Sequence, residues 1–116
     1  MQTKKDLESI KLDLEVYNKN LRDFSYTIKY VPVIPAVFVR FYGIFDKNLT
    51  NQTGGVKIIG FPNDFLDKYK PNYQTALSVH SSKKITFVAK SDGIYVNIMD
   101  TGLLNYAVWG AGFWFV

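Results

Sequence analysis

The amino-terminal stretch TKKDLESIKLDLEVYNKNLRDFSYTI, residues 3–28, carries the most regular pattern in the chain. Large apolar residues recur in it at alternating steps of three and four, as at the a and d positions of a heptad repeat. The e and g positions of this repeat are polar, so the apolar seam is narrow. Such a seam is typical of helices that associate with copies of themselves. The residues expected at the oligomer contact are Leu7, Ile10, Leu14, Tyr17, Leu21, Phe24 and Ile28.

A single amphipathic helix lying on its own domain is the alternative for this stretch. Leu12 and Val16 lie outside the seam and favour that alternative. Asp6 and Lys11, at g and the following e, instead suit an ion pair between parallel helices. The pattern spans about three heptads, the minimum for predicting a coiled coil. We therefore expect a coiled-coil stalk over residues 3–28.

The rest of the chain predicts a compact antiparallel β-barrel or sandwich, a head over residues 36–116 joined to the stalk by a proline-containing neck at 29–35. The clearest strand is 36–46, where apolar residues occupy both alternating faces, so one face should meet the sheet and the other a neighbouring subunit. Glycines in the last strand suggest a bulge or the close approach of another backbone. Several short strands at regular spacing are typical of a barrel or sandwich. The other expected strands are 56–61, 75–80, 84–90, 94–99 and 106–116, with a helical turn at 64–69 in the loop 62–72.

Composition narrows the possible functions. The chain has 116 residues, no cysteine, one histidine and a net charge of +4. The absence of cysteine excludes a thiolate metal site and a catalytic Cys/His pair, and a single histidine cannot form a cluster of metal-binding nitrogen ligands. We therefore expect no cofactor. The lysines and arginines are scattered rather than arranged in a basic stripe, which argues against a nucleic-acid partner. The charged N-terminus lacks the apolar segment of a signal peptide, and no apolar run is long enough for membrane insertion.

The aromatic content of 16% is high for a small β domain and is compatible with a ligand-binding face. The face of a sugar ring stacks on an aromatic side chain while its hydroxyl groups bond to nearby polar residues. Trp109 and Trp114 are expected in the core or at an interface, with ligand contact as the alternative. His80, at the end of a strand, is either a structural hydrogen-bonding residue or a ligand contact.

Four segments together resemble the head domain of receptor-binding proteins from baseplates of phages that infect Gram-positive bacteria. They are Val37–Gly43, Ala76–His80, Asp92–Ile98 and the ending Trp109–Val116, which is similar to the family's Gly-x-Gly-x-Tyr terminus. The resemblance covers residues 36–116 and rests on the order and spacing of strands more than on identities.

The resemblance implies a homotrimeric adhesion protein on the virion, in the phage tail or baseplate. It would bind a host cell-wall polysaccharide or a teichoic-acid-like polymer and contact other baseplate proteins. The family's His-x-Asp, Trp and Arg contacts are not retained here: the matching positions hold Thr86 and Val88, then Asn97 or Ile98, then Trp109. The residues expected to bind the ligand are Trp109, Tyr95, Asn97 and His80.

Two other functions are compatible with the sequence. The first is a structural oligomerisation module of a tail or baseplate with protein partners only. The second is a polysaccharide-degrading enzyme, which ranks last because Asp64 and Asp67 lie in an exposed-looking loop rather than in an apolar pocket. We therefore expect binding without catalysis.

Overall fold

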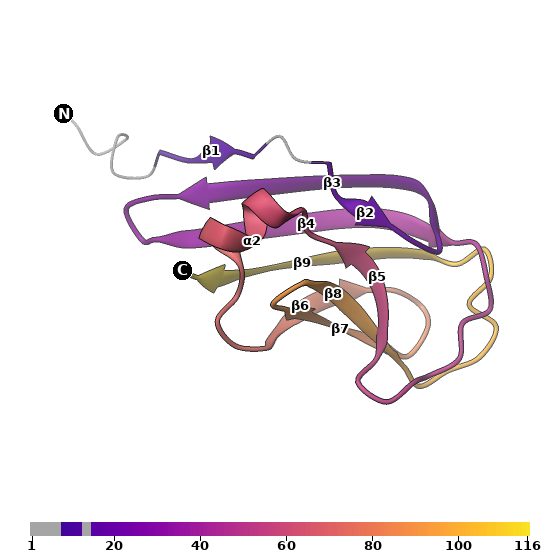
Figure 1. Ribbon diagram of the computed structural model, residues 1–116. Coiled ribbons are helices and arrows are strands. Elements are labelled where there is room, and N and C mark those ends of the chain that lie inside the picture. The colour runs from indigo at the N-terminus through magenta and orange to yellow at the C-terminus, as the bar shows by residue number, and fades with distance from the viewer. Residues whose placement is uncertain (1–7, 13–14) are drawn as a thin grey trace.

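The computed structural model describes residues 8–12 and 15–116. These residues form a mainly β fold in which one antiparallel sheet curls into a half-barrel (Figure 1), which confirms the predicted β class. The strand order is β1-β3-β4-β9-β6-β7-β8-β5-β2. The strands are β1 Ile10–Lys11, β2 Tyr17–Asn18, β3 Leu21–Val31, β4 Ala36–Phe45, β5 Val56–Gly60, β6 Thr75–His80, β7 Ile85–Lys90, β8 Gly93–Ile98 and β9 Ala107–Phe115.

The predicted coiled-coil helix is wrong wherever the structure describes residues 3–28. In place of the helix lie β1, β2 and the long strand β3, which pairs with β4 from Leu21 opposite Phe45 to Val31 opposite Ala36, with one register break. Leu7 and Leu14, two residues of the expected seam, lie outside the described residues.

A β-bulge explains how a strand can imitate a heptad spacing. Between Arg22 and Ser25, β3 advances three residues while β4 advances two, and Asp23 takes a positive φ of 53°. The extra residue shifts the alternation of side chains by one position. A spacing of three residues across the bulge returns to the same face of the sheet, because two residues complete one period and the third is the bulged residue. A spacing of four residues returns to the same face because it covers two full periods. Leu21, Phe24 and Ile28 consequently all pack on the core face.

The predicted oligomer contact is dispersed by this fold. Leu21 and Ile28 are buried in the core, whereas Ile10 on β1 and Tyr17 on β2 are 45% and 57% exposed. The predicted boundary between stalk and neck falls within β3, and residues 32–35 form the tight turn of the β3–β4 hairpin rather than an extended neck. The trimer itself stays a prediction, without a helical stalk to support it.

Strand β4 confirms the predicted alternation. Val37, Val39, Phe41 and Phe45 are buried, whereas Phe38, Arg40, Tyr42 and Ile44 point to the other face and are partly or fully exposed. A neighbouring subunit on that outer face stays a prediction.

Two glycines of β9 leave room for side chains of neighbouring strands. They mark neither the bulge nor the close approach of another backbone that the sequence suggested. Strand β9 pairs with β4 without a register break. A Cβ atom added to Gly110 would lie 2.4 Å from Cζ of Phe41, and one added to Gly112 would lie 2.4 Å from Cδ2 of Leu77. Core side chains from the neighbouring strands therefore extend across β9 at these two positions.

The helix α2, Asn63–Tyr69, confirms the predicted helical turn and packs onto the barrel. Its buried residue is Phe65, whose ring lies 4.6 Å from that of Phe61 and 6.4 Å from that of Trp114 between centroids. The indole Nε1 of Trp114 donates a hydrogen bond of 2.6 Å to the carbonyl oxygen of Tyr69. Trp114 is thus a core residue, the first of the two roles considered for it.

Candidate functional site

The outer face of strands β3, β4, β9 and β6 is the most distinctive exposed surface of the described residues. Cross-strand pairing arranges its side chains in rows. The first row runs across all four strands through Ser25, Tyr42, Trp109 and His80, which lie opposite one another in register. We call this surface the outer face.

The first row presents aromatic rings to solvent. Trp109 is 47% exposed although it stands in the middle of the sheet. Its ring centroid lies 4.8 Å from that of Tyr42 and 5.5 Å from that of His80. Neighbours on both sides therefore hold the indole in place while half of its surface stays open.

A middle row of smaller side chains opens a hollow beside these rings. Thr27, Arg40, Ala111 and Ser78 lie opposite one another on the same four strands. Together with the aromatic row they line an open hollow of about 570 Å³. This volume is in the range of small-molecule sites. The hollow forms because Ala111 stands between the bulky Trp109 and Phe113 on the same face of β9.

A third row closes the other side of the middle row. It consists of Lys29, Phe38 and Phe113, and the two phenyl rings stack with centroids 5.3 Å apart. A second hollow of about 410 Å³ lies between this row and the middle row. Arg40, Thr27, Ser78 and Ala111 line both hollows, so the two share one floor.

The charged residues that line the two hollows have one sign. Among the residues that line the two hollows are Arg40 and Lys29, and none is an aspartate or glutamate. The ion pairs among the described residues are Arg22–Asp23 and Lys57–Asp92, so neither Arg40 nor Lys29 is in an ion pair there. The same surface offers the hydroxyl groups of Ser25, Thr27 and Ser78 as hydrogen-bonding groups.

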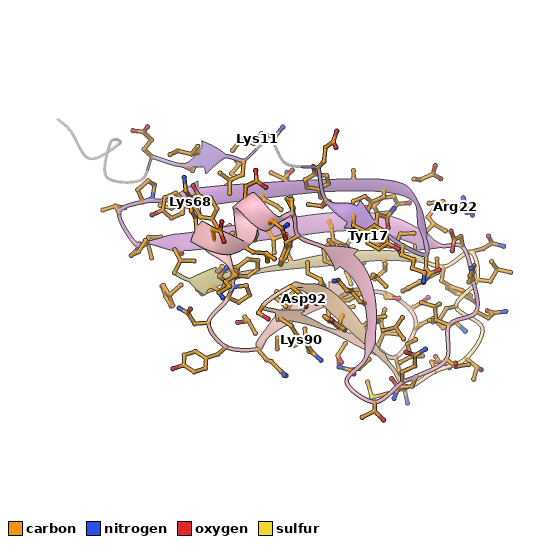
Figure 2. All side chains as sticks on the ribbon, viewed as in Figure 1. Lys11, Tyr17, Arg22, Lys68, Lys90 and Asp92 are labelled. Carbon is orange, nitrogen blue, oxygen red and sulfur yellow. The ribbon has the colours of Figure 1, made fainter. Side chains whose placement is uncertain are left out.

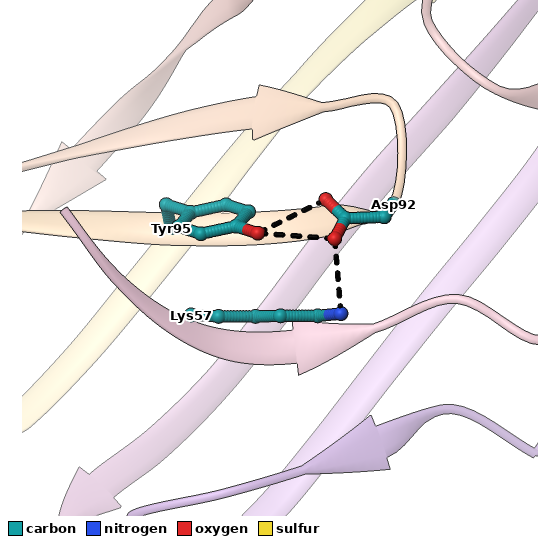
Figure 3. Close-up of polar contacts among 3 residues, drawn as sticks. All are labelled: Lys57, Asp92 and Tyr95. Carbon is teal, nitrogen blue, oxygen red and sulfur yellow. Dashed lines mark hydrogen bonds and ion pairs between the residues drawn. The ribbon is translucent and has the colours of Figure 1, made fainter. Parts of the chain in front are cut away.

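The structure brings together two of the four predicted ligand residues on the outer face and places the other two on a different strand. Trp109 and His80 line the first hollow. Tyr95 and Asn97 lie on β8, and β7 separates that strand from β6. The hydroxyl of Tyr95 donates to both carboxylate oxygens of Asp92, at 3.0 and 3.1 Å (Figure 3).

The surroundings of Tyr95 occupy its ring and its hydroxyl. The ammonium of Lys90 lies 4.3 Å from the centre of the ring, and the Nζ atom of Lys57 bonds to Asp92 at 3.1 Å. Figure 2 shows Lys90 and Asp92 close together at the β7–β8 turn. This cluster is a paired network, unlike the open row around Trp109, and the ligand role expected for Tyr95 and Asn97 stays a prediction.

Two pKa values in this network are shifted in opposite directions. Burial by itself raises the pKa of Asp92, but the hydrogen bonds from Lys57 and Tyr95 and the charge of Lys57 outweigh it and hold the pKa below its ordinary value. Burial, followed by the hydrogen bond to the Asp92 carboxylate and its charge, raises the pKa of the Tyr95 hydroxyl. At neutral pH the cluster therefore contains a charged carboxylate and a neutral phenol.

Sequence reasoning missed most of the outer face. Tyr42, Arg40, Phe38, Phe113 and Ser78 were not predicted as ligand residues. The alternation of β4 did place Phe38, Arg40 and Tyr42 on one face, and that was the available signal. The missing information was which strands flank β4, because β9 lies far away in sequence.

Comparisons with known proteins add no further constraint on the site. No protein family, curated protein or solved structure matches the chain. Within residues 8–12 and 15–116, no group of three or more potential metal ligands gathers at one place. The same residues contain no helix that is long and apolar enough to span a membrane.

Proposed function

We propose that this protein is a saccharide-binding module that holds its ligand on the outer face and performs no chemistry on it. The observation that carries the proposal is the half-exposed indole of Trp109, fixed between Tyr42 and His80 and bordering a hollow with hydroxyl groups on its floor. Sugar rings present an apolar face and a polar edge. This surface offers an aromatic ring for the first and hydrogen-bonding side chains for the second.

The proposal includes the adhesion role that the sequence resemblance implies. A module of this kind on a phage tail or baseplate would attach the virion to a cell-wall saccharide of its bacterial host. A homotrimer would increase the avidity of such attachment, because linked sites bind a polymer with a high effective concentration. With β3 in place of a stalk helix, the described residues offer surfaces of the β fold, not a coiled coil, for such a contact.

A structural oligomerisation module is the second candidate. Its support is the exposure of Phe38, Phe113 and Phe115, which are large apolar residues at one end of the outer face. Exposed apolar patches on a small protein often mark contacts with other proteins.

Replacing Trp109 by alanine tests the saccharide-binding proposal. Binding to a glycan array and to purified cell-wall polysaccharide should weaken by about tenfold or more, since aromatic stacking contributes about 0.5–1.5 kcal/mol beyond buried area. The matched control is Tyr73→Ala, because Tyr73 is 85% exposed and lines neither hollow.

Three outcomes would contradict the proposal. Equal binding by Trp109→Ala and Tyr73→Ala would move the ligand away from the outer face. Absence of binding to any glycan, together with a stable oligomer, would favour the structural module. Release of reducing sugar from a bound polysaccharide would show that the protein is an enzyme.

A further inference from the structure

Resting on the proposed saccharide function, we infer that the ligand is an anionic chain that lies along β4 and β9 across both hollows, with its acidic group on Arg40. The inference comes from the second hollow, which the sequence-based prediction did not include. It adds Phe38 and Phe113 to the site and makes Arg40 its central residue.

The dimensions of the outer face favour a chain over a single ring. Trp109 and Phe113 are four residues apart on β9, which corresponds to about 13 Å along a strand. The floor between them is continuous, because Arg40, Ala111, Ser78 and Thr27 line both hollows. A ligand that touches both aromatic rows must therefore be longer than one sugar ring and run parallel to the strands.

The charges of the outer face favour an acidic ligand. Arg40 is exposed and is the charged residue common to both hollows, and Lys29 stands at the edge of the second. A guanidinium group presents parallel N–H donors that match carboxylate and phosphate oxygens. The lining residues include no carboxylate that would compete for Arg40 or repel an anion.

The same charges argue against a two-fold contact in which the outer face of a second copy covers this one. In a two-fold symmetric contact the same patch meets itself. The outer face would then bring Arg40 and Lys29 towards the same cations of the partner copy, with no aspartate or glutamate of the hollows between them. An anionic chain neutralises these charges, whereas a second copy doubles them.

Titration with defined oligosaccharides, followed by calorimetry or by intrinsic tryptophan fluorescence, tests the inference. The series should contain uronic-acid oligomers, phosphate-bearing polyol oligomers and neutral glucose oligomers of matched lengths from one unit upward. We expect affinity to rise with length for the acidic series and to fall as salt is added. Preference for the uronic-acid or the phosphate series identifies the acidic group, and either preference supports an anionic chain.

Two variants and one matched control locate the interaction. Arg40→Gln should weaken acidic oligomers by about tenfold and leave neutral ones nearly unchanged, because it removes a charge-assisted hydrogen bond. Phe113→Ala should weaken long oligomers while the monosaccharide is unaffected. Arg22→Gln is the control, since Arg22 is an exposed arginine of β3 that bonds Asn105 and lines neither hollow. All three positions are exposed, and circular dichroism will verify the fold of each variant.

The outcomes separate this inference from the function on which it rests. Neutral oligomers that bind as tightly as acidic ones, with no effect of Arg40→Gln, would overturn the anionic ligand and leave saccharide binding intact. A monosaccharide that binds as tightly as a long oligomer would overturn the chain. Failure of every saccharide to bind would overturn the proposed function itself. A dimer in sedimentation that Phe113→Ala dissociates would assign the outer face to a second copy.

Discussion

Substituting Gly110 by alanine tests the packing that underlies the outer face. Gly110 lies on β9, and its missing side chain faces the core, between the outward-facing Trp109 and Ala111. An added Cβ atom would lie 2.4 and 2.5 Å from Cζ and Cε1 of Phe41. Non-bonded carbon atoms normally approach to about 3.5–4.0 Å, so the overlap exceeds 1 Å.

The surroundings of Phe41 decide how much this overlap destabilises the fold. The ring packs edge-on against Phe87 with centroids 5.0 Å apart, and both residues are buried. The ring therefore has little room to retreat, and overpacking of this kind costs about 1–3 kcal/mol. Alanine is better than glycine inside a strand by about 0.5–1 kcal/mol, which offsets part of the cost. We expect a net loss of about 1–2 kcal/mol in the free energy of unfolding.

Gly112→Ala is the matched control on the same strand and the same face. Its added Cβ atom would also meet a side-chain atom at 2.4 Å, but that atom is the terminal methyl Cδ2 of Leu77. A leucine methyl group can move by a small rotation, so the clash should nearly cancel the gain from replacing glycine. We expect a change of about 0.5 kcal/mol or less for Gly112→Ala.

Urea unfolding of both variants measures the difference, provided that the slope of the transition stays constant. A Phe41→Leu background should reduce the effect of Gly110→Ala, because a shorter side chain relieves the overlap, and a double-mutant cycle isolates this coupling. If Gly110→Ala and Gly112→Ala are equally stable, or if the cycle shows no coupling, the packing of Phe41 across β9 is refuted.

Two further perturbations probe the polar cluster and α2. The lowered pKa of Asp92 means that this carboxylate stabilises the fold above its ordinary value of 3.8, and that the contribution is lost as the pH falls through the folded-state pKa. Asp92→Asn should therefore lower stability at pH 7 by at most about 1 kcal/mol, since both side chains of the Lys57–Asp92 pair are more than one-third exposed. Thermal unfolding should show the stability difference between the variant and the natural chain shrinking towards pH 2. A stability difference that grows in acid would refute this role of Asp92. Phe65→Ala should cost about 3–5 kcal/mol in urea unfolding, because it empties a fully buried aromatic site, and the partly buried Leu66→Ala should cost clearly less. Equal effects of the last two would mean that Phe65 does not anchor α2.

The strands after residue 36 could be predicted from the sequence to within about two residues, because their signals are local. The segment 75–80 alternates and ends in turn residues, and the structure places β6 over the same residues. Ser91-Asp92-Gly93, between the expected strands 84–90 and 94–99, is a turn sequence, and the structure places the hairpin of β7 and β8 there. Alternation and turn chemistry depend on a few neighbouring residues, so the tertiary fold rarely overrides them.

The prediction for residues 3–28 was wrong because its signal was not specific to one kind of secondary structure. A spacing of three and four residues is compatible with a helical seam and also with strands interrupted by a turn and a bulge. Asn20 and Asp23, with φ values of 73° and 53°, produce these interruptions. The aromatic and β-branched residues of 26–31 favoured a strand, and pairing with β4 decided the outcome.

The sequence could predict individual residues of the candidate site but not which of them lie next to one another. Trp109 and His80 were chosen separately, and the structure places them opposite each other because β6 pairs with β9. Tyr42 joins them because β9 also pairs with β4, a contact between residues more than sixty positions apart. No local pattern encodes that neighbour relation, so a cross-strand row cannot be assembled from sequence alone.

Strand β9 connects the stability of the core with the shape of the outer face. Towards the core, Gly110 and Gly112 give room to Phe41 and Leu77, which hold β9 between its neighbours. Towards solvent, Ala111 leaves the hollows open between Trp109 and Phe113. Because neighbouring rings pack against Trp109 and Phe113, these side chains should lose little conformational entropy on binding the proposed ligand, and preorganisation of this kind increases affinity. A larger residue at position 111 should therefore weaken binding without loss of stability, whereas a larger residue at position 110 should reduce stability first.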